Sequence, residues 1–307
     1  MTDSTVDGPG SGSGTGRWLA GATRPVAFLV VTGAYLLAGA VAAAVALPLA
    51  GVHPVLVALS ADLAATLVIF ALSELVANAS LYDPYWSVAP PVIAVCWVAV
   101  ATPGASVARQ VVVLALILAW AVRLTGHWAG TWRGLGHEDW RYADLRAWAR
   151  HRPVPPARPG RARPGLPWWL VNLAGIQLMP TLLVFAGMLP VWPAVAGGTR
   201  RFGVLDVVAT VVTGAAVVLE ATADAQLKRF TRDPANRGRV ADRGVWRYLR
   251  HPNYLGEIGL WWGLWLFGLA AAPRWWWSVV GPLAMVLLFV AASIPLMDRR
   301  LLARRPG

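Results

Sequence analysis

The residues whose types and spacing favour chemistry gather at one junction between a basic and an apolar segment, within residues 242–263. The basic segment ends at His251-Pro252, and an apolar, Trp-rich run follows directly. Proline suits the first position of a helix, where its missing N–H is not needed, so we expect a helix to begin at Pro252 with His251 at or next to its N-cap. The free N–H groups and the positive end of the helix dipole would favour a phosphate or a carboxylate there. The polar side chains that converge on this helix start are Arg247, Arg250, His251, Asn253, Tyr254 and Glu257.

Carboxylates within apolar segments form a second group of candidates. A charge in the hydrocarbon core costs about 2.5–3.5 kcal/mol, so such residues usually face the interior of a helix bundle and serve a function. Glu74 is the candidate for substrate contact, and Asn78, four residues later, is expected to share its helix face. Glu220 and Asp224 are also four residues apart, and a charge ladder at a helix end is the alternative interpretation for them. Asp62, early in its segment, is interpreted as structural.

The composition indicates a membrane protein. The 307 residues are 57% hydrophobic and 14% charged, with a mean hydropathy of +0.54, which leaves too little polar surface for a soluble domain of this length. The net charge is +12, and because the arginines lie beside apolar segments, membrane lipids rather than nucleic acid are the expected partner. The single cysteine, Cys96, allows no internal disulfide and is expected to pack inertly. No metal site is predicted, because the histidines do not pair at ligand spacing.

We predict an all-α fold, a polytopic membrane helix bundle of about seven to eight transmembrane helices. Residues 1–23 read as a disordered tail, and residues 24–307 as a single integral-membrane domain. The third apolar segment is short for a span, which needs about 20 residues, so seven is the alternative to eight. The predicted segments lie at about 25–48, 55–77, 88–102, 107–125, 168–191, 203–225, 253–272 and 275–297.

The distribution of basic residues predicts the orientation. With eight spans, one side of the membrane carries only Arg109, Arg200, Arg201 and Arg274. By the positive-inside rule the richer side, which holds both termini and every polar block, is cytoplasmic. On that side the long loop 126–167 interleaves arginines, acidic residues and tryptophans, and its pattern over 138–150 predicts an amphipathic helix lying in the headgroup plane.

Four sequence blocks carry a family resemblance. The run Arg250-His-Pro-Asn-Tyr-Leu-Gly-Glu257 with its following Trp-Trp-Gly resembles the C-terminal signature of the steroid 5α-reductase superfamily, in the bacterial branch known as domain of unknown function 1295. That signature covers about residues 203–300. The other blocks are Asn78 to Ser87, His137 to Arg146, and Glu220 to Phe230, so that the resemblance extends from about residue 74 to the C-terminus.

The resemblance implies a membrane-embedded oxidoreductase that uses NADPH to reduce a carbon–carbon double bond of the enone type. The substrate would be lipophilic, and steroid-like or lipid-like, and the enzyme would sit in the bacterial inner membrane with a cytoplasmic active site. A catalytic Glu and Tyr of the family correspond to Glu74 and to either Tyr82 or Tyr85. The residues that match cofactor-contacting or cavity-completing blocks are Arg141, Tyr142, Arg146, Glu220, Asp224, Arg247, Arg250, His251, Asn253, Tyr254 and Glu257.

Two other functions fit parts of the sequence. The Arg-His-Pro-x-Tyr-x-Gly-Glu motif also resembles the isoprenylcysteine carboxyl methyltransferases, in which S-adenosylmethionine is the cofactor, but that family would leave the Asn78 and His137 blocks unexplained. A transporter or a non-catalytic membrane protein is the third possibility. The lack of an internal repeat and the clustering of polar residues at one face argue against a transporter. The sequence identifies neither the substrate nor the oligomeric state.

Overall fold

The computed structural model describes residues 21–149, 166–236 and 238–304. Within those ranges every regular element is helical, which confirms the predicted fold class. The predicted tail, residues 1–23, lies almost entirely outside the described residues. The uninterrupted helices are α2 (Arg24–Ala46), α3 (Pro54–Leu75), α4 (Tyr85–Ala99), α5 (Val107–Thr131), α6 (Trp140–Ala149), α9 (Val204–Arg232) and α10 (Pro252–Ala271).

Two further long helices are composites, in which tighter or wider turns interrupt the α-helix. The first consists of α7 (Trp168–Leu170), the π-helical η3 (Val171–Leu178), α8 (Met179–Met188) and the π-helical η4 (Pro193–Gly197). The second consists of the 3₁₀ segment η7 (Pro273–Val279), α11 (Val280–Leu288), the π-helical η8 (Phe289–Ser293) and α12 (Ile294–Arg304).

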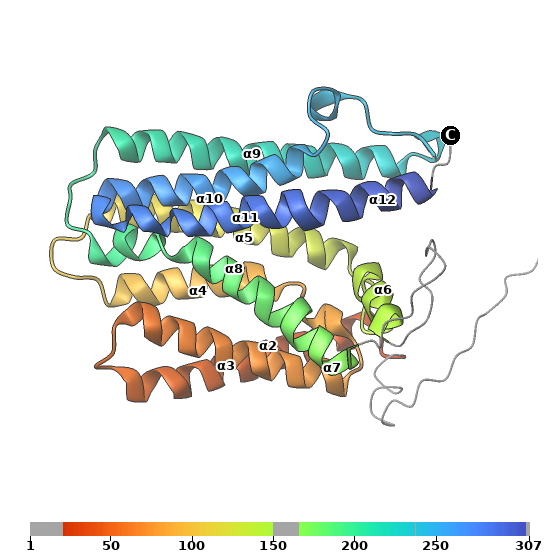
Figure 1. The fold of residues 1–307 in the computed structure, drawn as a ribbon, viewed down its shortest axis with the longest axis horizontal. Helices are drawn as coiled ribbons and strands as arrows, with labels where there is room; N and C mark the ends of the chain where they lie inside the picture. Colours follow the sequence, from red (N-terminus) through yellow and green to blue (C-terminus); the bar gives the residue numbers. More distant parts are fainter. Residues whose placement is uncertain (1–20, 150–165, 237, 305–307) are drawn as a thin grey trace, which may run out of the picture.

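Six of the described helices are long and apolar enough to cross a membrane. Figure 1 shows these helices along the long axis of the molecule, with α4 and α10 running in the same direction among them. α4 has only 15 residues, and the glycines, tryptophans and Glu257 of α10 lower its hydropathy. Six spans are therefore found among the described residues, and the count of seven or eight stays a prediction. The six are Arg24–Leu49, Pro54–Leu75, Val107–Thr131, Trp168–Gly197, Val204–Arg232 and Pro273–Arg300.

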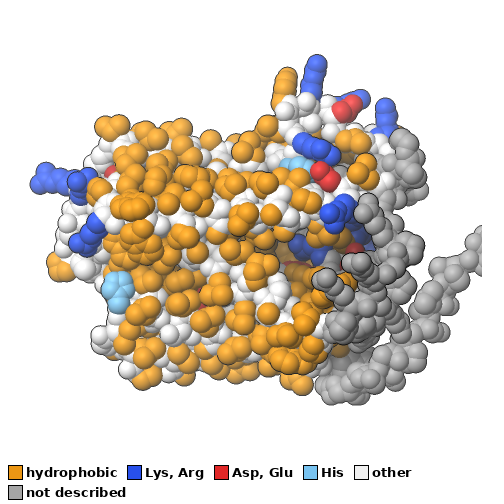
Figure 2. Space-filling model, in the orientation of Figure 1, with side chains coloured by type: hydrophobic (Ala, Val, Ile, Leu, Met, Phe, Trp, Pro, Cys, Tyr) orange, Lys and Arg blue, Asp and Glu red, His pale blue; other side chains and the backbone are white. Residues whose placement is uncertain are grey.

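The outer surface supports the membrane assignment. Figure 2 shows hydrophobic side chains over the flank of the bundle, whereas charged side chains gather toward its two ends. Large apolar side chains are exposed along the spanning helices, among them Leu29, Leu36, Val122, Val211 and Leu287. An apolar surface of this extent would be unstable in water and fits contact with lipid, so the six apolar helices indicate an integral membrane protein.

α10 packs closely along α9 because its contact face is lined by glycines. A Cβ atom at Gly256 would come within 2.7 Å of the Cβ atom of Glu220, and one at Gly263 would come within 3.0 Å of the backbone nitrogen of Thr213. Small residues of this kind let membrane helices approach until their backbones touch. The close contact brings the carboxylates of α9 and α10 to one level of the bundle.

The two ends of the bundle differ in their polar groups. The end that we call the Arg109 end holds the turns before α5, before α9 and after α10; there Thr102 N–H donates to the carbonyl of Ala196 at 3.0 Å. The end that we call the α6 end holds α6, the turn after α3 and the long loop 233–251 between α9 and α10. The turns at the Arg109 end are short, so the larger polar segments share the other end.

Two local expectations, those for Asn78 and Cys96, differ from the structure. α3 ends at Leu75, and Ala77 takes a left-handed conformation with φ 54°, so Asn78 does not share a helix face with Glu74. The N–H of Asn78 bonds back to the carbonyl of Ser73, a C-terminal cap that usually employs glycine and was therefore not visible in the sequence. Cys96 is exposed on α4 rather than packed. α6 lies within the predicted segment 138–150, and its placement in a headgroup plane stays a prediction.

A buried ion pair fastens the Arg109 end. Arg109 in α5 is fully buried, and its Nε and Nη2 donate to the two carboxylate oxygens of Asp206 in α9 at 2.6 and 2.9 Å. Its Nη1 and Nη2 also donate to the carbonyls of Arg200 and Arg201 at 3.0 and 3.1 Å. Asp206 in turn accepts the N–H of Gly203 at 2.8 Å. The pair joins two spanning helices and the turn between them.

Replacing Arg109 with methionine should destabilise the protein by about 3–5 kcal/mol, because the carboxylate of Asp206 is left buried without its partner. Adding Asp206→Asn should recover part of that loss, because it removes the unpaired charge. Thermal unfolding of the purified single and double variants in one detergent measures both effects. Simple addition of the two losses would show that the unpaired carboxylate is not the cause.

Candidate functional site at the α6 end

The helix start singled out in the sequence lies at the α6 end. α10 begins at Pro252 with His251 as its N-cap, as predicted. The ring of His251 stacks on that of Tyr254, with centroids 5.2 Å apart, and its Nε2 lies 3.2 Å from Oδ1 of Asp298 in α12. Nη2 of Arg250 lies 3.2 Å from the other oxygen of Asp298. One carboxylate thus ties the start of α10 to the last helix of the chain.

Tyr254 is the residue at which four elements meet. Its ring packs against Phe289, with centroids 4.9 Å apart. Its phenol interacts electrostatically with Arg141 of α6, Asp224 of α9 and Asp298 of α12. The structure therefore brings together three of the predicted cofactor residues, Arg141, Asp224 and Tyr254. The first and the last of them are more than a hundred positions apart in the sequence.

Polar contacts fix α6 to the turn after α3. Oε1 of Glu138 accepts the N–H of Ala79 at 2.9 Å and Nη2 of Arg146 at 2.8 Å. The guanidinium of Arg146 also lies over the ring of Trp168, 3.8 Å from its centroid. Nδ2 of Asn78 donates to the backbone carbonyl of Leu135, in the loop that leads into α6, at 2.7 Å. Arg146 is therefore held by internal partners, and the Asn78 and His137 blocks form one structural unit.

The first turn of α6 carries a second set of contacts. The O–H of Tyr142 donates to Oδ1 of Asp83 at 2.7 Å, and Nε of Arg141 lies 2.8 Å from Oδ1 of Asp139. Burial raises the pKa of Asp83 to about 6, although Arg141 and the hydrogen bond from Tyr142 both act to lower it. Burial and the neighbouring Asp83 raise the pKa of Tyr142 well above its usual value. The side chain of Arg141 is 46% exposed and is the most accessible group of this set.

The predicted carboxylates of α9 face the interior of the bundle. Glu220 and Asp224 both pair with Arg123 of α5, at 2.5 and 2.6 Å. Glu257 of α10 interacts with Glu220 and accepts two indole N–H groups at 2.8 and 3.0 Å, from Trp120 and Trp261. Because Glu220 is 5% exposed and Glu257 is 4% exposed, these residues form a buried network rather than a solvated charge ladder.

A separate buried polar strip follows the contact between α3 and η3. Nδ2 of Asn172 donates to Oε1 of Glu74 at 2.6 Å, and Nε2 of Gln177 donates to Oγ of Ser73 at 2.8 Å and to Oδ1 of Asn172 at 3.1 Å. Asn172 and Gln177 share one face because η3 is π-helical, and its hydrogen bonds join residues five apart. Gln177 is fully buried, and its Oε1 has no hydrogen-bond partner among the described residues.

The strip continues deeper into the bundle at Tyr82. Its hydroxyl lies 2.8 Å from Oγ1 of Thr181 in α8, which lies 3.0 Å from Oγ1 of Thr66 in α3. Thr66 precedes Glu74 by eight residues, which corresponds to about 12 Å along the helix. Glu74 and Tyr82 therefore lie on one polar strip at two different depths.

Tyr85 occupies the deepest position. Its ring stacks on that of Tyr82, with centroids 5.4 Å apart, and its O–H donates to Oδ1 of Asp62 at 2.6 Å. Asp62 is 7% exposed, so the residue that we interpreted as structural is the partner of a candidate catalytic tyrosine.

The remaining predicted residues lie at the rim of the α6 end. Arg247 is exposed, with its guanidinium 6.0 Å from the ring centroid of Tyr248. The side chain of Arg250 is 75% exposed, and Asn253 is half-buried in the first turn of α10. Of the predicted cofactor residues, Arg247 and Arg250 have the freest access to a solute.

Arg123, Asn172, Gln177 and Asp298 are among the contact residues that the sequence analysis missed. Arg123 lies inside an apolar segment, so the criterion applied to carboxylates would have found it. Asn172 and Gln177 show no α-helical spacing, and only the π-helical turn aligns them. Asp298 lies in a charged C-terminal run, where nothing in its sequence context sets it apart from a solvated tail.

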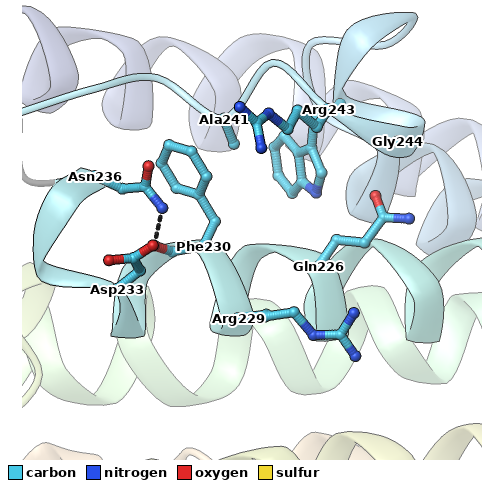
Figure 3. Close-up of a pocket in the computed structure, with 9 residues that line it drawn as sticks. Gln226, Arg229, Phe230, Asp233, Asn236, Ala241, Arg243 and Gly244 are labelled. Carbon is cyan, nitrogen blue, oxygen red and sulfur yellow. Dashed lines mark hydrogen bonds between the residues drawn. The ribbon is translucent and has the colours of Figure 1, made fainter.

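A pocket of about 380 Å³ also lies at the α6 end. It is bounded by the end of α9 and the loop that follows, and Figure 3 shows Phe230 pointing from the helix toward Ala241 of the loop. The predicted site residues do not line this pocket.

Comparison with known proteins gives a family without a described activity. The chain is 25% identical over 251 residues to the uncharacterized protein C594.04c of Schizosaccharomyces pombe, in an alignment that covers 74% of this chain and 68% of the yeast protein. No solved structure matches the chain. The sequence profile of the family described as protein of unknown function, DUF1295, matches residues 69–306, which include all of α6 and both buried polar networks except Asp62 and Thr66. The chain belongs to this DUF1295 family.

Proposed function

We propose that the protein is an integral-membrane reductase that uses NADPH to reduce an enone-type carbon–carbon double bond in a lipophilic, steroid-like or lipid-like substrate. The observation that carries the proposal is the polar strip formed by half-buried Glu74 and by buried Asn172, Gln177 and Tyr82 within an otherwise apolar bundle. Buried polar groups are retained in apolar surroundings where they bind or act on something, and an unpaired acceptor such as Oε1 of Gln177 marks an incomplete set. A molecule that reaches this strip must be mostly apolar and carry a hydrogen-bonding group.

The strip suits the acid half of an enone reduction. When hydride adds to the β-carbon, the carbonyl oxygen gains negative charge, and a hydrogen-bond donor at that oxygen stabilises the enolate. We assign this role to Glu74, which would donate from one carboxyl oxygen while Asn172 holds the other. Gln177 fixes Asn172, and Tyr82 and Tyr85 would orient the far end of the substrate deeper in the bundle.

Exposed arginines at the rim of the α6 end support the choice of NADPH as the cofactor. When bound, this cofactor supplies the hydride. Its phosphates would be held by the exposed guanidinium groups of Arg247 and Arg250 and by the free N–H groups at the start of α10. The stacked rings of His251 and Tyr254 offer a flat surface next to these groups, and Arg141 lies within reach of Tyr254. The more deeply held residues, Tyr142, Arg146, Glu220, Asp224 and Glu257, would position this rim rather than grip the cofactor.

The same proposal includes the orientation. Because most arginines of the described residues lie at the α6 end, we infer that this end and both termini face the cytoplasm of a bacterial cell, with the protein in the inner membrane. Reduced nicotinamide cofactors are found in that compartment.

Replacing Glu74 with glutamine should lower turnover by about 10²- to 10⁴-fold, because the amide keeps the shape but cannot supply a proton to the carbonyl oxygen. Oxidation of NADPH by the purified protein, offered a panel of lipophilic enones, measures this directly. Asp144→Asn, which removes an exposed carboxylate of α6, is the matched control and should retain full turnover. Equal turnover of Glu74→Gln and wild type would exclude Glu74 as the acid.

Replacing Arg247 or Arg250 with glutamine should weaken NADPH binding by about 10-fold or more each, because a hydrogen bond to a charged group contributes about 1.5–3 kcal/mol. Titration of the purified variants with NADPH, followed by cofactor fluorescence, gives the dissociation constants. Arg274→Gln, at the Arg109 end, removes the same charge and should leave binding unchanged. Tight binding of S-adenosylmethionine that is insensitive to both rim variants, with no NADPH binding, would instead favour a methyltransferase.

A further inference from the structure

Two carboxyl groups meet inside the buried network of α5, α9 and α10. Glu220 of α9 and Glu257 of α10 are 5% and 4% exposed, and their side chains are in hydrogen-bond contact. An ionised carboxylate only accepts hydrogen bonds, so two ionised carboxylates in contact would repel each other with no hydrogen between them. The contact therefore requires a hydrogen that neither ionised group supplies.

The packing of α9 against α10 keeps the two carboxyl groups at one level. The helices lie side by side in Figure 1, and a Cβ atom at Gly256 would come within 2.7 Å of the Cβ atom of Glu220. A Cβ atom at Gly259 would come within 3.0 Å of the Cβ atom of Ala216, one turn along α9. Because Glu257 directly follows Gly256, the close approach of the two backbones holds it at the height of Glu220.

Oε2 of Glu220 is the atom that lacks a donor. The other oxygen of this residue, Oε1, pairs with Nη2 of Arg123 at 2.5 Å. Oε2 is buried and finds no hydrogen-bond donor among the described residues. Both oxygens of Glu257 already accept an indole N–H, Oε2 from Trp120 at 2.8 Å and Oε1 from Trp261 at 3.0 Å. Buried polar atoms are rarely left unpaired, and one hydrogen held between Glu220 and Glu257 would satisfy this one.

The charges of the cluster also require a proton. Arg123, with a side chain 14% exposed, pairs with both Glu220 and Asp224. Glu257 adds a third carboxyl group to this single guanidinium. Full ionisation would therefore leave two negative charges without compensation in the interior of the bundle, where unpaired charges are costly.

No other cation of the described residues compensates these charges. Arg123 is the basic residue that forms an ion pair with Glu220, and none forms an ion pair with Glu257. The next titratable side chains on α5, α9 and α10 toward the α6 end are His127, Lys228 and Tyr254. α8, η4 and α11, which also pack against α10, carry no titratable side chain, and Arg274 of η7 lies at the Arg109 end.

We propose that Glu220 and Glu257 hold one proton between them at neutral pH, so that a carboxyl–carboxylate hydrogen bond joins α9 to α10. The pair then carries a single negative charge, which the indole N–H groups of Trp120 and Trp261 and the guanidinium of Arg123 stabilise. In alkaline solution the proton is lost, and two adjacent negative charges repel each other across the contact between the helices. The pair thus makes the contact of α9 with α10 sensitive to pH.

Replacing Glu220 with glutamine should not lower the unfolding temperature at neutral pH, because the amide can accept from Arg123 and donate to Glu257. The temperature should equal or exceed that of wild type, since the folded variant no longer has to take up a proton. Asp224→Asn is the matched control beside the same arginine. It removes a carboxylate that is ionised, and it should lower the unfolding temperature by about 5 °C. Thermal unfolding of the purified full-length proteins in one detergent measures both effects.

Two further comparisons sharpen the test. Glu257→Gln should be less stable than Glu220→Gln, because both oxygens of Glu257 accept an indole N–H and an amide nitrogen would face one of these donors. Wild type should also lose stability as the pH is raised from neutral to alkaline values, because its folded state binds a proton that the unfolded state has released. Glu220→Gln lacks that proton and should lose less.

Infrared difference spectra of wild type and Glu220→Gln report the proton directly. At neutral pH the difference should contain the C=O band of a protonated carboxyl group, and its absence would overturn the proposal. A fall in the unfolding temperature of Glu220→Gln as large as that of Asp224→Asn, or failure of Glu220→Gln to fold, would show that Glu220 is ionised. None of these measurements contains cofactor or substrate, so they test the proton pair independently of the proposed reductase activity.

Discussion

The cost of placing charged and polar groups in hydrocarbon is the constraint on which the rest of this structure depends. An ionised side chain in the membrane is stable only with partners that replace water, and the described spans provide them across helix contacts. Each such contact therefore fixes the relative rotation and height of two helices, which apolar packing alone does not specify. The interhelical contacts are Arg109 with Asp206, Arg123 with Glu220 and Asp224, Trp120 with Glu257, Asn172 with Glu74, and Tyr85 with Asp62.

These contacts divide the bundle into two parts. One network joins α5, α9 and α10 through Arg123 and the indole donors of Trp120 and Trp261, and Oε2 of Glu220 has no hydrogen-bond partner among the described residues. The other joins α3, η3, α8 and the start of α4, and contains amides, hydroxyls and only two carboxylates. In the proposed function, the first part would hold the cofactor rim in place, and the second would contact an uncharged, mostly apolar substrate. α6 links the parts, because its Tyr142 donates to Asp83 in the turn after α3, and its Arg141 interacts electrostatically with Tyr254 of α10.

Much of the fold could be predicted from the sequence because the membrane leaves few alternatives. Runs of apolar residues gave each long helix to within a few residues at most ends, and Pro252 located the start of α10. The failures have physical causes. Ala77 takes a left-handed conformation that glycine usually adopts, so α3 ends before Asn78. The π-helical segment η3 places Asn172 and Gln177 on one face at a spacing of five, which is not an α-helical spacing. The sequence allowed us to predict that the polar blocks of the candidate site lie at one end of the bundle. It did not allow us to predict which residues pair, because the partners come from helices that are distant in the sequence.

The arginines of the α6 end differ in how readily they would exchange partners. Arg123 has a side chain 14% exposed between two carboxylates, so separating it would leave charges buried without partners, at a cost of about 3–5 kcal/mol. Arg250 also pairs with a carboxylate, but it is 75% exposed, and an ion pair in that setting contributes only about 0–1 kcal/mol. A phosphate that offers two charge-assisted hydrogen bonds would therefore displace Asp298 from Arg250 far more easily than it would displace Glu220 from Arg123. Exposure thus separates arginines that hold the bundle together from arginines that are available to a ligand, although both kinds form ion pairs in the structure.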